Sequence, residues 1–289
     1  MYESYWRKMG KNCDITFNGD DSLSYFANGK ILCWFLESKL EEQIKRLHNV
    51  VGNAIVDDHY IVVGTGSSQL VQAALYALSP SDQFEPIYVV SATPFYSVHA
   101  YPDVKTFEKY GPYIELITSP NNPDGIIREP VVNEDQGILL LPNLPTMMLC
   151  SLLFPNALAM LVLELDKDVA RKMTKFMEII AISVSKEGQL RVAKILKVVF
   201  NSYLDFTLQN FFEYSQSLMT DRWQRLRQVV MDNDHFQDFC ESHPGGEEED
   251  CEKLLKEHKN KTRSGRRFGS DSRSVRLNML SRDEDLTFF

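Results

Sequence analysis

The stretch Tyr60-Ile-Val-Val-Gly-Thr-Gly-Ser-Ser-Gln69 decides the fold class, because it passes from a β-branched run through a glycine turn into a helix pattern. The run from Tyr60 to Val63 predicts a short strand, and the small-residue pattern from Gln69 to Leu78 predicts a helix. A phosphate would suit such a turn, since free backbone N–H groups and the helix dipole attract an anion, and Ser67 and Ser68 add hydroxyl donors. The same residues also serve an ordinary tight connection with a serine N-cap, and the third glycine of the dinucleotide fingerprint is absent.

Strands and helices alternate through the first half of the chain and give way to helices in the second half. In the first half, hydrophobic periodicity predicts further strands at residues 87–90 and 113–118 and an amphipathic helix at residues 38–51. In the second half it predicts helices at residues 169–182, 189–200 and 211–239 and a half-buried strand at residues 275–279. Alternation of this kind is typical of a parallel α/β sheet, so we expect an α/β region at residues 1–167 and a mostly helical region with a C-terminal small lobe at residues 168–289.

The charge balance and the cysteine content argue against several classes of protein. With 40 acidic and 31 basic residues, the formal net charge is -9, which opposes binding to nucleic acid or to an anionic membrane surface. The five cysteines form no Cys-x-x-Cys pair, so neither a disulfide framework nor a four-ligand zinc site is indicated. Cys240 and His243 are the only close Cys/His pair, and two ligands alone are more often coincidence than a metal site. We therefore expect no metal and a reducing compartment, the cytoplasm.

The stretch from Ile138 to Leu163 carries no charged residue and is long enough to cross a bilayer. Its prolines, Pro142, Pro145 and Pro155, would break a membrane-spanning helix. A buried pair of strands in a parallel sheet gives a similarly continuous apolar run. We therefore expect this stretch to be buried core, and a membrane-associated segment is the alternative that its length leaves open.

The second motif is Thr118-Ser-Pro-Asn-Asn-Pro-Asp-Gly125, at the end of a predicted strand. Ligands of parallel α/β sheets gather at the carboxyl ends of the strands, although Pro-Asp-Gly is also ordinary turn chemistry. The combination Ser-Pro-Asn-Asn-Pro-Asp-Gly resembles the signature of fold-type-I aminotransferases. The resemblance implies a parallel-rich sheet flanked by helices, with a smaller C-terminal α+β lobe.

Further segments, spread over most of the chain, are similar to those of the plant tryptophan-aminotransferase-related family, which is alliinase-like. They are Tyr5-Trp-Arg-Lys-Met-Gly10, Leu32-Cys-Trp-Phe-Leu36, His48-Asn-Val-Val-Gly-Asn53, Gly111-Pro-Tyr-Ile-Glu-Leu116, Val184-Ser-Lys-Glu187, Arg191-Val-Ala-Lys-Ile-Leu196 and Val275-Arg-Leu-Asn-Met-Leu-Ser-Arg282.

This resemblance implies a binding site for pyridoxal 5'-phosphate in residues 1–167. Tyr25 would contact the cofactor phosphate, and Ser67 and Ser68 would sit in the phosphate cup. Asn122 would hydrogen-bond the phenolic oxygen of the cofactor ring. Arg276 would bind the α-carboxylate of the substrate, which suits a planar guanidinium able to make two parallel hydrogen bonds.

The catalytic lysine of the resembled family has no counterpart in this chain. In that family, a segment after the asparagine motif supplies an aspartate for the pyridine nitrogen, and a Ser-Lys-x-Thr-Gly-His-Ala-Gly-x-Arg stretch supplies the lysine that forms the Schiff base. Here no lysine occurs between Lys109 and Lys167. Asp135 is the nearest aspartate after the motif, but its context differs, and Lys167 lies in Asp166-Lys-Asp-Val-Ala170, which matches a helical part of the family pattern. Lost exons or a faulty gene model would give this gap, and so would a degenerate paralogue.

The resemblance implies amino transfer from L-tryptophan, or another aromatic amino acid, to a 2-oxo acid, as in auxin biosynthesis. It also implies a homodimer, because relatives share active sites between subunits. Without the lysine, the alternatives are a catalytically dead paralogue or truncated gene product that acts, if at all, as a binding protein. An alliinase-like carbon–sulfur lyase is a further alternative.

Overall fold

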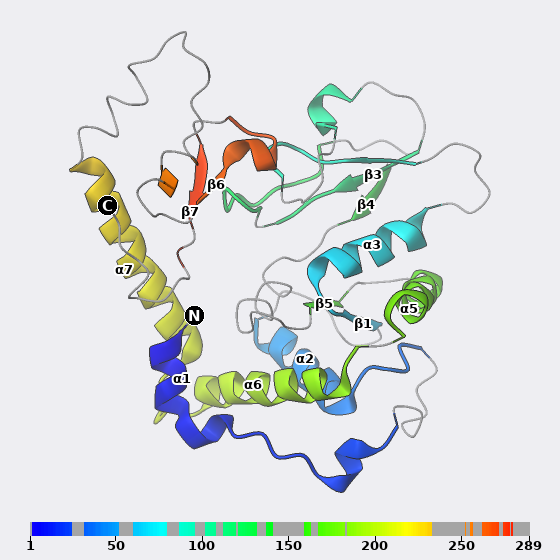
Figure 1. Cartoon of the computed structure of the whole chain (residues 1–289), viewed down its shortest axis with the longest axis vertical. Helices are drawn as coiled ribbons and strands as arrows, with labels where there is room; N and C mark the ends of the chain where they lie inside the picture. Colours follow the sequence, from blue (N-terminus) through cyan, green and yellow to red (C-terminus); the bar gives the residue numbers. More distant parts are fainter. Residues whose placement is uncertain are drawn as a thin grey trace.

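A computed structural model contains most of the elements that the sequence predicts (Figure 1). The residues that it describes are 2–24, 32–51, 60–79, 87–95, 102–107, 112–119, 121–131, 137–140, 159–162, 167–182, 184–232, 252, 255–256, 262–271, 274–277 and 279.

The strand, glycine turn and helix expected after Tyr60 are present. The strand β1 (Ile61–Gly64) is buried along its whole length, and the helix α3 (Ser67–Leu78) begins directly after the turn. Gly64 is required by close packing, because a Cβ atom there would lie 2.8 Å from the Leu70 Cγ atom and 3.0 Å from the Met177 Cε atom. The absence of a side chain at this position thus lets α3 and a second helix, which carries Met177, approach the strand closely.

Three strands form a parallel sheet in the order β2-β3-β4, which confirms the predicted α/β class. They are β2 (Tyr88–Val90), β3 (Tyr113–Leu116) and β4 (Gly137–Leu140). β3 is the central strand and all of its residues are buried. Its carboxyl end leads directly into the motif that begins at Thr118, so the sheet places that motif where α/β proteins bind ligands.

Further helices are α1 (Glu3–Met9), α2 (Ser38–Val51), α5 (Lys167–Ala181), α6 (Lys186–Leu204) and α7 (Phe211–Met231). Most of them lie below the parallel sheet in the view of Figure 1, and α7 runs along the left side of the view. α5 packs against α3 and β1, and α6 packs against α2. Their apolar faces share one hydrophobic core, in which Ile44, Leu70 and Met173 are fully buried. The predicted helices at 38–51, 169–182 and 189–200 are thereby confirmed, while the predicted division at residue 167 stays a prediction.

The side chain of Gln189 fastens the N-terminal segment to α6. Its Nε2 atom donates to the backbone oxygens of Phe35, at 2.8 Å, and Val184, at 3.3 Å, and its Oε1 atom accepts from the Glu37 N–H group at 2.8 Å. Gln189 is fully buried, so these hydrogen bonds are shielded from water. A buried amide with its donors and its acceptor satisfied holds its neighbours in one arrangement.

The C-terminal part of the chain forms a small antiparallel ladder of β6 (Thr262–Ser264) and β7 (Val275–Leu277), joined through the 3₁₀ helix η5 (Gly265–Phe268). Figure 1 shows this ladder beside the parallel sheet. The predicted strand at residues 275–279 is confirmed over residues 275–277.

The ends of the uncharged run form strands, but not in one sheet. β4 lies in the parallel sheet, whereas β5 (Ala159–Val162) pairs with β1 in the antiparallel direction. The expectation that this stretch is buried core stays a prediction, and the antiparallel pairing of β5 was not predictable, because an apolar run does not encode the direction or the partner of a strand. Residues 141–158 lie outside the described residues. Within the part of the chain that the structure describes, no helix is both long and apolar enough to cross a membrane.

The first prediction concerns Gln189. Gln189→Ala should lower the free energy of unfolding by about 2–3 kcal/mol, because it leaves a buried N–H group and buried carbonyls without partners. Gln224→Ala, on the exposed face of α7, is the matched control and should change stability by less than about 0.5 kcal/mol. Urea unfolding followed by circular dichroism measures both, and equal losses in the two variants would contradict the role given to Gln189.

Candidate functional site

The loop that follows β3 is built around the side chain of Asn121, which is buried. Its Nδ2 atom donates to the backbone oxygen of Pro94 at 2.9 Å and to Asp124 Oδ1 at 2.8 Å, and its Oδ1 atom accepts from the Thr118 hydroxyl group. Its backbone also closes the turn, since its N–H group donates to the Ile126 oxygen at 2.7 Å. Asn121 therefore has a structural role, and its amide has no group to spare for a ligand.

Arg128 clamps this loop against the segment that follows β2. Its guanidinium donates to Asp124 Oδ2 at 2.8 Å, and to the backbone oxygens of Ala92 at 2.6 Å and Thr93 at 3.3 Å. Burial by itself would raise the pKa of the Asp124 carboxyl. Hydrogen bonds from the Ile126 N–H group and from the Asn121 and Arg128 side chains outweigh burial and hold that pKa below its usual value. Asp124 is therefore charged at neutral pH and fixes the loop electrostatically.

Asn122, the residue predicted to face the cofactor ring, lies on this clamped loop and is only 9% exposed. In contrast to its neighbour Asn121, its side chain has no hydrogen-bond partner among the described residues. Asn121 thus holds the loop, whereas the side chain of Asn122 makes no hydrogen bond to a described residue and stands at the end of the sheet where α/β proteins bind ligands.

Ser67 and Ser68 lie at the start of α3, after a turn that other residues hold. The Thr65 backbone N–H and hydroxyl groups both donate to Gln69 Oε1, each at 2.7 Å. The N-cap of α3 is Gly66, with no side-chain cap, so the interpretation of these residues as a serine N-cap was wrong. Within the described part of the chain, neither serine hydroxyl group takes part in a hydrogen bond. Both are available to an anion at the helix terminus, where the first backbone N–H groups point outward.

The segment after β2 also contacts the C-terminal lobe. The Phe95 N–H group donates to the Phe268 backbone oxygen at 2.9 Å. Gly269, which follows Phe268, has a positive φ of 71°, and a Cβ atom there would lie 2.8 Å from the Phe95 ring and 3.0 Å from the Thr93 methyl group. This contact needs glycine for both its conformation and its closeness.

Arg276, the predicted substrate-binding residue, lies on β7, and its guanidinium carbon is 5.8 Å from the centre of the Phe268 ring. It is half-buried. The segment at residues 92–95 therefore joins two predicted parts of the site, because it binds Asn121 and Arg128 on one side and Phe268 on the other. No hydrogen bond within the described part of the chain joins Ser67 or Ser68 to Asn122 or Arg276.

The structure leaves most of the remaining predicted positions untested. Tyr25, Asp135, Cys240 and His243 lie outside the described residues. Lys167 is the first residue of α5, exposed, as the helical match to the family pattern predicts. No group of three or more metal-ligating side chains occurs within the described ranges.

Sequence reasoning overlooked Arg128 and the structural role of Asn121. The spacing of Asp124 and Arg128, four residues apart with opposite charges, was the available signal. The carbonyl groups that Arg128 binds come from a segment more than thirty residues earlier, and periodicity does not report such contacts.

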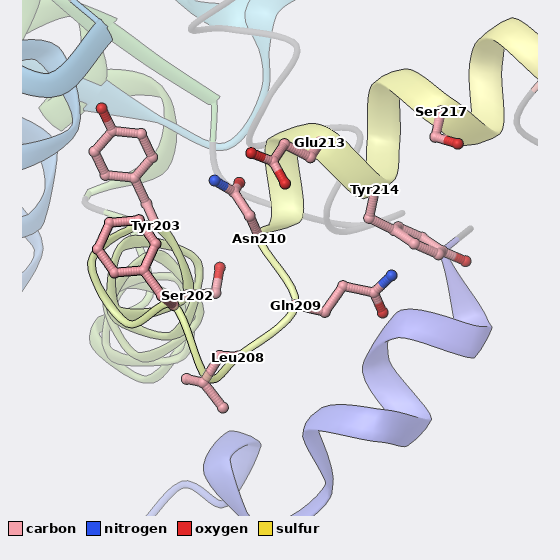
Figure 2. Close-up of a pocket in the computed structure, with 9 residues that line it drawn as sticks. Ser202, Tyr203, Leu208, Gln209, Asn210, Glu213, Tyr214 and Ser217 are labelled. Atoms are coloured by element: carbon pink, nitrogen blue, oxygen red, sulfur yellow. The ribbon is translucent and has the colours of Figure 1, made fainter.

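A pocket elsewhere in the structure lies at the junction of α6 and α7 (Figure 2). None of the predicted site residues lines it. Its residues have structural tasks, since Asn210 accepts from the Phe212 N–H group as the N-cap of α7 and the Ser202 hydroxyl group donates to the Val199 oxygen.

Comparison with known proteins identifies relatives of this chain. A family model described as Allinase matches residues 1–143, 161–244 and 240–289. Tryptophan aminotransferase-related protein 2 of Arabidopsis thaliana is 42% identical over 343 aligned residues, which cover all of this chain and 78% of that protein. Tryptophan aminotransferase-related protein 2 of Oryza sativa subsp. japonica is 35% identical, over all of this chain and 70% of that protein. Alliin lyase of Allium cepa is 27% identical, over 98% of this chain and 71% of that protein.

Solved structures with the same fold are fold-type-I aminotransferases. An aspartate aminotransferase mutant from Thermus thermophilus aligns with a TM-score of 0.57 at 13% identity, over 86% of this chain and 78% of that one. MJ0684 from Methanococcus jannaschii aligns with a TM-score of 0.56 at 17% identity, over the same shares. These likenesses confirm the predicted fold class.

The comparisons also locate a difference. The alignment with the Arabidopsis relative spans 343 positions although this chain has 289 residues, so the relative contains residues that the chain lacks. The family model leaves residues 144–160 unmatched, inside the uncharged run.

The second prediction tests the clamp. Asp124→Asn should lower the free energy of unfolding by about 1–2 kcal/mol at pH 7, because it removes a charge-assisted hydrogen bond to Arg128. The folded-state pKa of Asp124 is lowered, so this stabilisation is present above the ordinary carboxyl pKa of about 3.9 and is lost as the pH falls through the folded value.

The measurement is urea unfolding of both proteins from pH 7 down to pH 3, over which the difference between them should shrink. Asp221→Asn, in an exposed ion pair with Arg225 on α7, is the control and should cost less than about 0.5 kcal/mol at any pH. A difference between Asp124→Asn and the parent protein that is constant with pH would argue against the clamp.

Proposed function

The chain belongs to the family described as Allinase, and from this premise we propose that it binds pyridoxal 5'-phosphate between the start of α3 and the loop after β3. The observation that carries the proposal is the place of Asn122 on a clamped loop at the carboxyl end of β3, where its side chain has no hydrogen-bond partner among the described residues. Within this family, relatives in Arabidopsis and rice carry the name tryptophan aminotransferase-related protein.

The residues present fit two ends of the cofactor. Ser67 and Ser68 would donate hydroxyl hydrogen bonds to the phosphate, with the N-terminus of α3 adding backbone donors and a favourable dipole. Asn122 would donate to the phenolic oxygen of the ring, and Tyr25 would contact the phosphate. When bound, the cofactor would supply an electron-accepting ring that stabilises negative charge at the α-carbon of an amino acid.

Arg276 would bind the α-carboxylate of the amino-acid or 2-oxo-acid substrate. Two parallel hydrogen bonds from a guanidinium orient a carboxylate better than a single point charge does. The contact of this guanidinium with the Phe268 ring would restrict its position. We propose L-tryptophan or another aromatic amino acid as the substrate, from the names of the relatives, and a homodimer as the assembly.

The chain does not fit the reacting centre of the cofactor. Its sequence has no lysine between Lys109 and Lys167, and Lys167 is exposed at the start of α5. Loss of the group that moves a proton at the reacting carbon typically lowers the rate by about 10²–10⁴. A misplaced lysine does not restore the rate, because the gain depends on orientation. We therefore propose very weak amino transfer, or a cofactor-binding protein without turnover.

A carbon–sulfur lyase is the second candidate, and the likeness to alliin lyase of Allium cepa supports it. The greater identity to the Arabidopsis protein named for tryptophan aminotransfer favours the first candidate. Release of pyruvate from a cysteine sulfoxide, measured beside tryptophan-dependent formation of an oxo acid, would distinguish the two.

The third prediction concerns the phosphate. The double variant Ser67→Ala with Ser68→Ala should bind pyridoxal 5'-phosphate about 10²- to 10⁴-fold more weakly, because each of the two hydroxyl groups contributes about 1.5–3 kcal/mol and about 1.4 kcal/mol is a factor of ten. Ser79→Ala is the matched control, since its hydroxyl group donates to the Leu75 oxygen at the opposite end of the same helix. Fluorescence titration with the cofactor gives the affinities, and an unchanged value in the double variant would refute the phosphate site.

The fourth prediction is that borohydride fixes no stoichiometric pyridoxyl group on any lysine of this chain. The physical reason is that no lysine lies in the stretch that would project it toward a ring held by Asn122. Intact-mass spectrometry after reduction and dialysis makes the measurement, with Lys167→Arg as the control that should behave like the parent. A full adduct on Lys167 that vanishes in Lys167→Arg, together with steady tryptophan-dependent turnover, would show that the active site is misplaced.

A further inference from the structure

The stretch between β4 and α5 differs from the family over a sharply bounded length. The family model matches up to residue 143 and resumes at residue 161. Beyond the gap, α5 begins at Lys167 and the chain again follows the family pattern. Substitutions that accumulate one at a time leave some residues in common, whereas a change of reading frame replaces every residue between two intact flanks. An unmatched stretch between two matched flanks is therefore compatible with a change of reading frame, which the codons of the residues can test.

We propose that residues 154–164 are the lysine-bearing stretch of the family translated one base out of frame. In the shifted frame, each codon joins the last base of one residue's codon to the first two bases of the next. The sequence to be recovered is the Ser-Lys-x-Thr-Gly-His-Ala-Gly-x-Arg stretch described above. The inference rests on the proposed function only for the role of that lysine.

Codons that are allowed for these residues can encode this stretch in the shifted frame, in order and without a gap. We call the shifted codon between two residues their junction. The junction of Phe154 and Pro155 can encode only serine or proline, and the junction of Pro155 and Asn156 can encode lysine. After one unspecified position, the junctions from Ala157 to Leu161 allow threonine, glycine, histidine and alanine in turn. The junctions from Leu161 to Glu164 then allow glycine, an unspecified residue and arginine. Each base is used once, so one nucleotide sequence satisfies all of these positions together.

Methionine makes part of the match stringent, because it has the single codon ATG. The junction of Met160 and Leu161 can therefore encode only alanine or valine, and the stretch requires alanine at that position. The junction of Ala159 and Met160 can encode only tyrosine, histidine, asparagine or aspartate, and the stretch requires histidine there.

Other readings of the same region fail. In the third reading frame, each codon joins the last two bases of one residue's codon to the first base of the next. Such a codon encodes lysine only where the first of the two codons ends in AA, and only Lys, Gln and Glu have codons with that ending. Residues 137–163 contain none of these three amino acids. In the proposed frame, lysine is also allowed at the junction of Pro142 and Asn143. There the stretch would need glycine at the junction of Pro145 and Thr146, which allows only tyrosine, histidine, asparagine or aspartate.

The shift also accounts for the apolar character of this part of the chain. A stretch rich in glycine, with lysine, histidine and arginine, becomes Leu158-Ala-Met-Leu-Val-Leu163 when its bases are read in the other frame. The residues Ala159–Val162 then form β5, whose ladder with β1 is made by main-chain groups. Neither a membrane span nor a catalytic strand is needed to explain an uncharged run here.

The fifth prediction follows from the genetic code. The bases of the transcript and of the genomic locus should read TTT for Phe154, CCA for Pro155 and GCA for Ala157. They should read CTG for Leu158 and Leu161, and GCC for Ala159. Each residue has synonymous codons that would serve equally well in the translated frame, so agreement at all six is expected only if the stretch is encoded.

Sequencing the locus and its transcript across this region decides the matter. Any other codon for Pro155 overturns the inference, since no other base there gives lysine, and a departure at any of the other five positions does so as well. The result is independent of the cofactor titration. The stated codons with no cofactor binding would refute the proposed function alone, and cofactor binding with different codons would refute this inference alone.

Discussion

The hydrogen-bonded clamp between Arg128, Asp124 and Asn121 is the interaction on which the candidate site depends. It fixes the loop after β3 against the segment at residues 92–95, and it satisfies the buried polar groups of that loop. A fully satisfied network in a partly buried place is strong and allows one geometry, whereas a partly satisfied one costs more than an apolar contact. Asn122 lies on the same loop and makes no side-chain hydrogen bond to a described residue, so the clamp fixes the position of its amide without using it.

The segment at residues 92–95, which the clamp binds, also contacts the C-terminal lobe. Phe95 binds the backbone of Phe268, and the closeness of this contact depends on glycine at position 269. Arg276, over the Phe268 ring, is thereby connected to the loop of Asn122 through one main-chain hydrogen bond, from Phe95 to Phe268, and through the side-chain hydrogen bonds of Asn121 and Arg128. Contacts between segments far apart in the sequence thus link the small lobe to the end of the parallel sheet.

Local patterns in the sequence predicted most of the elements, while contacts between distant segments were not predictable. The strand and helix around Gly64, and the helices at α2, α5 and α6, follow from periodicity, because each buries one face against a common core. The antiparallel direction of β5 did not follow, since an apolar strand has no mark of its partner. Ser67, Ser68 and Asn122 were named from their motifs, but the pairing of Arg128 with carbonyl groups near residue 92 depends on the fold itself.

Most elements that stabilise the described fold lie outside the stretch that would supply the lysine, although β5 lies within it and pairs with β1. The described core includes residues of α2, β1, α3, β3, α5 and α6. The buried side chain of Gln189 adds hydrogen bonds to the backbone of Phe35 and Glu37. The groups that would hold the two ends of the cofactor stand on α3 and on the loop after β3, which this core and the clamp support. Burial of apolar surface determines whether the chain folds, whereas the reaction depends on one amine placed within a fraction of an ångström. A change confined to the stretch between β4 and α5 would therefore remove the proposed chemistry and leave α3 and the clamp, which would hold the cofactor, in place.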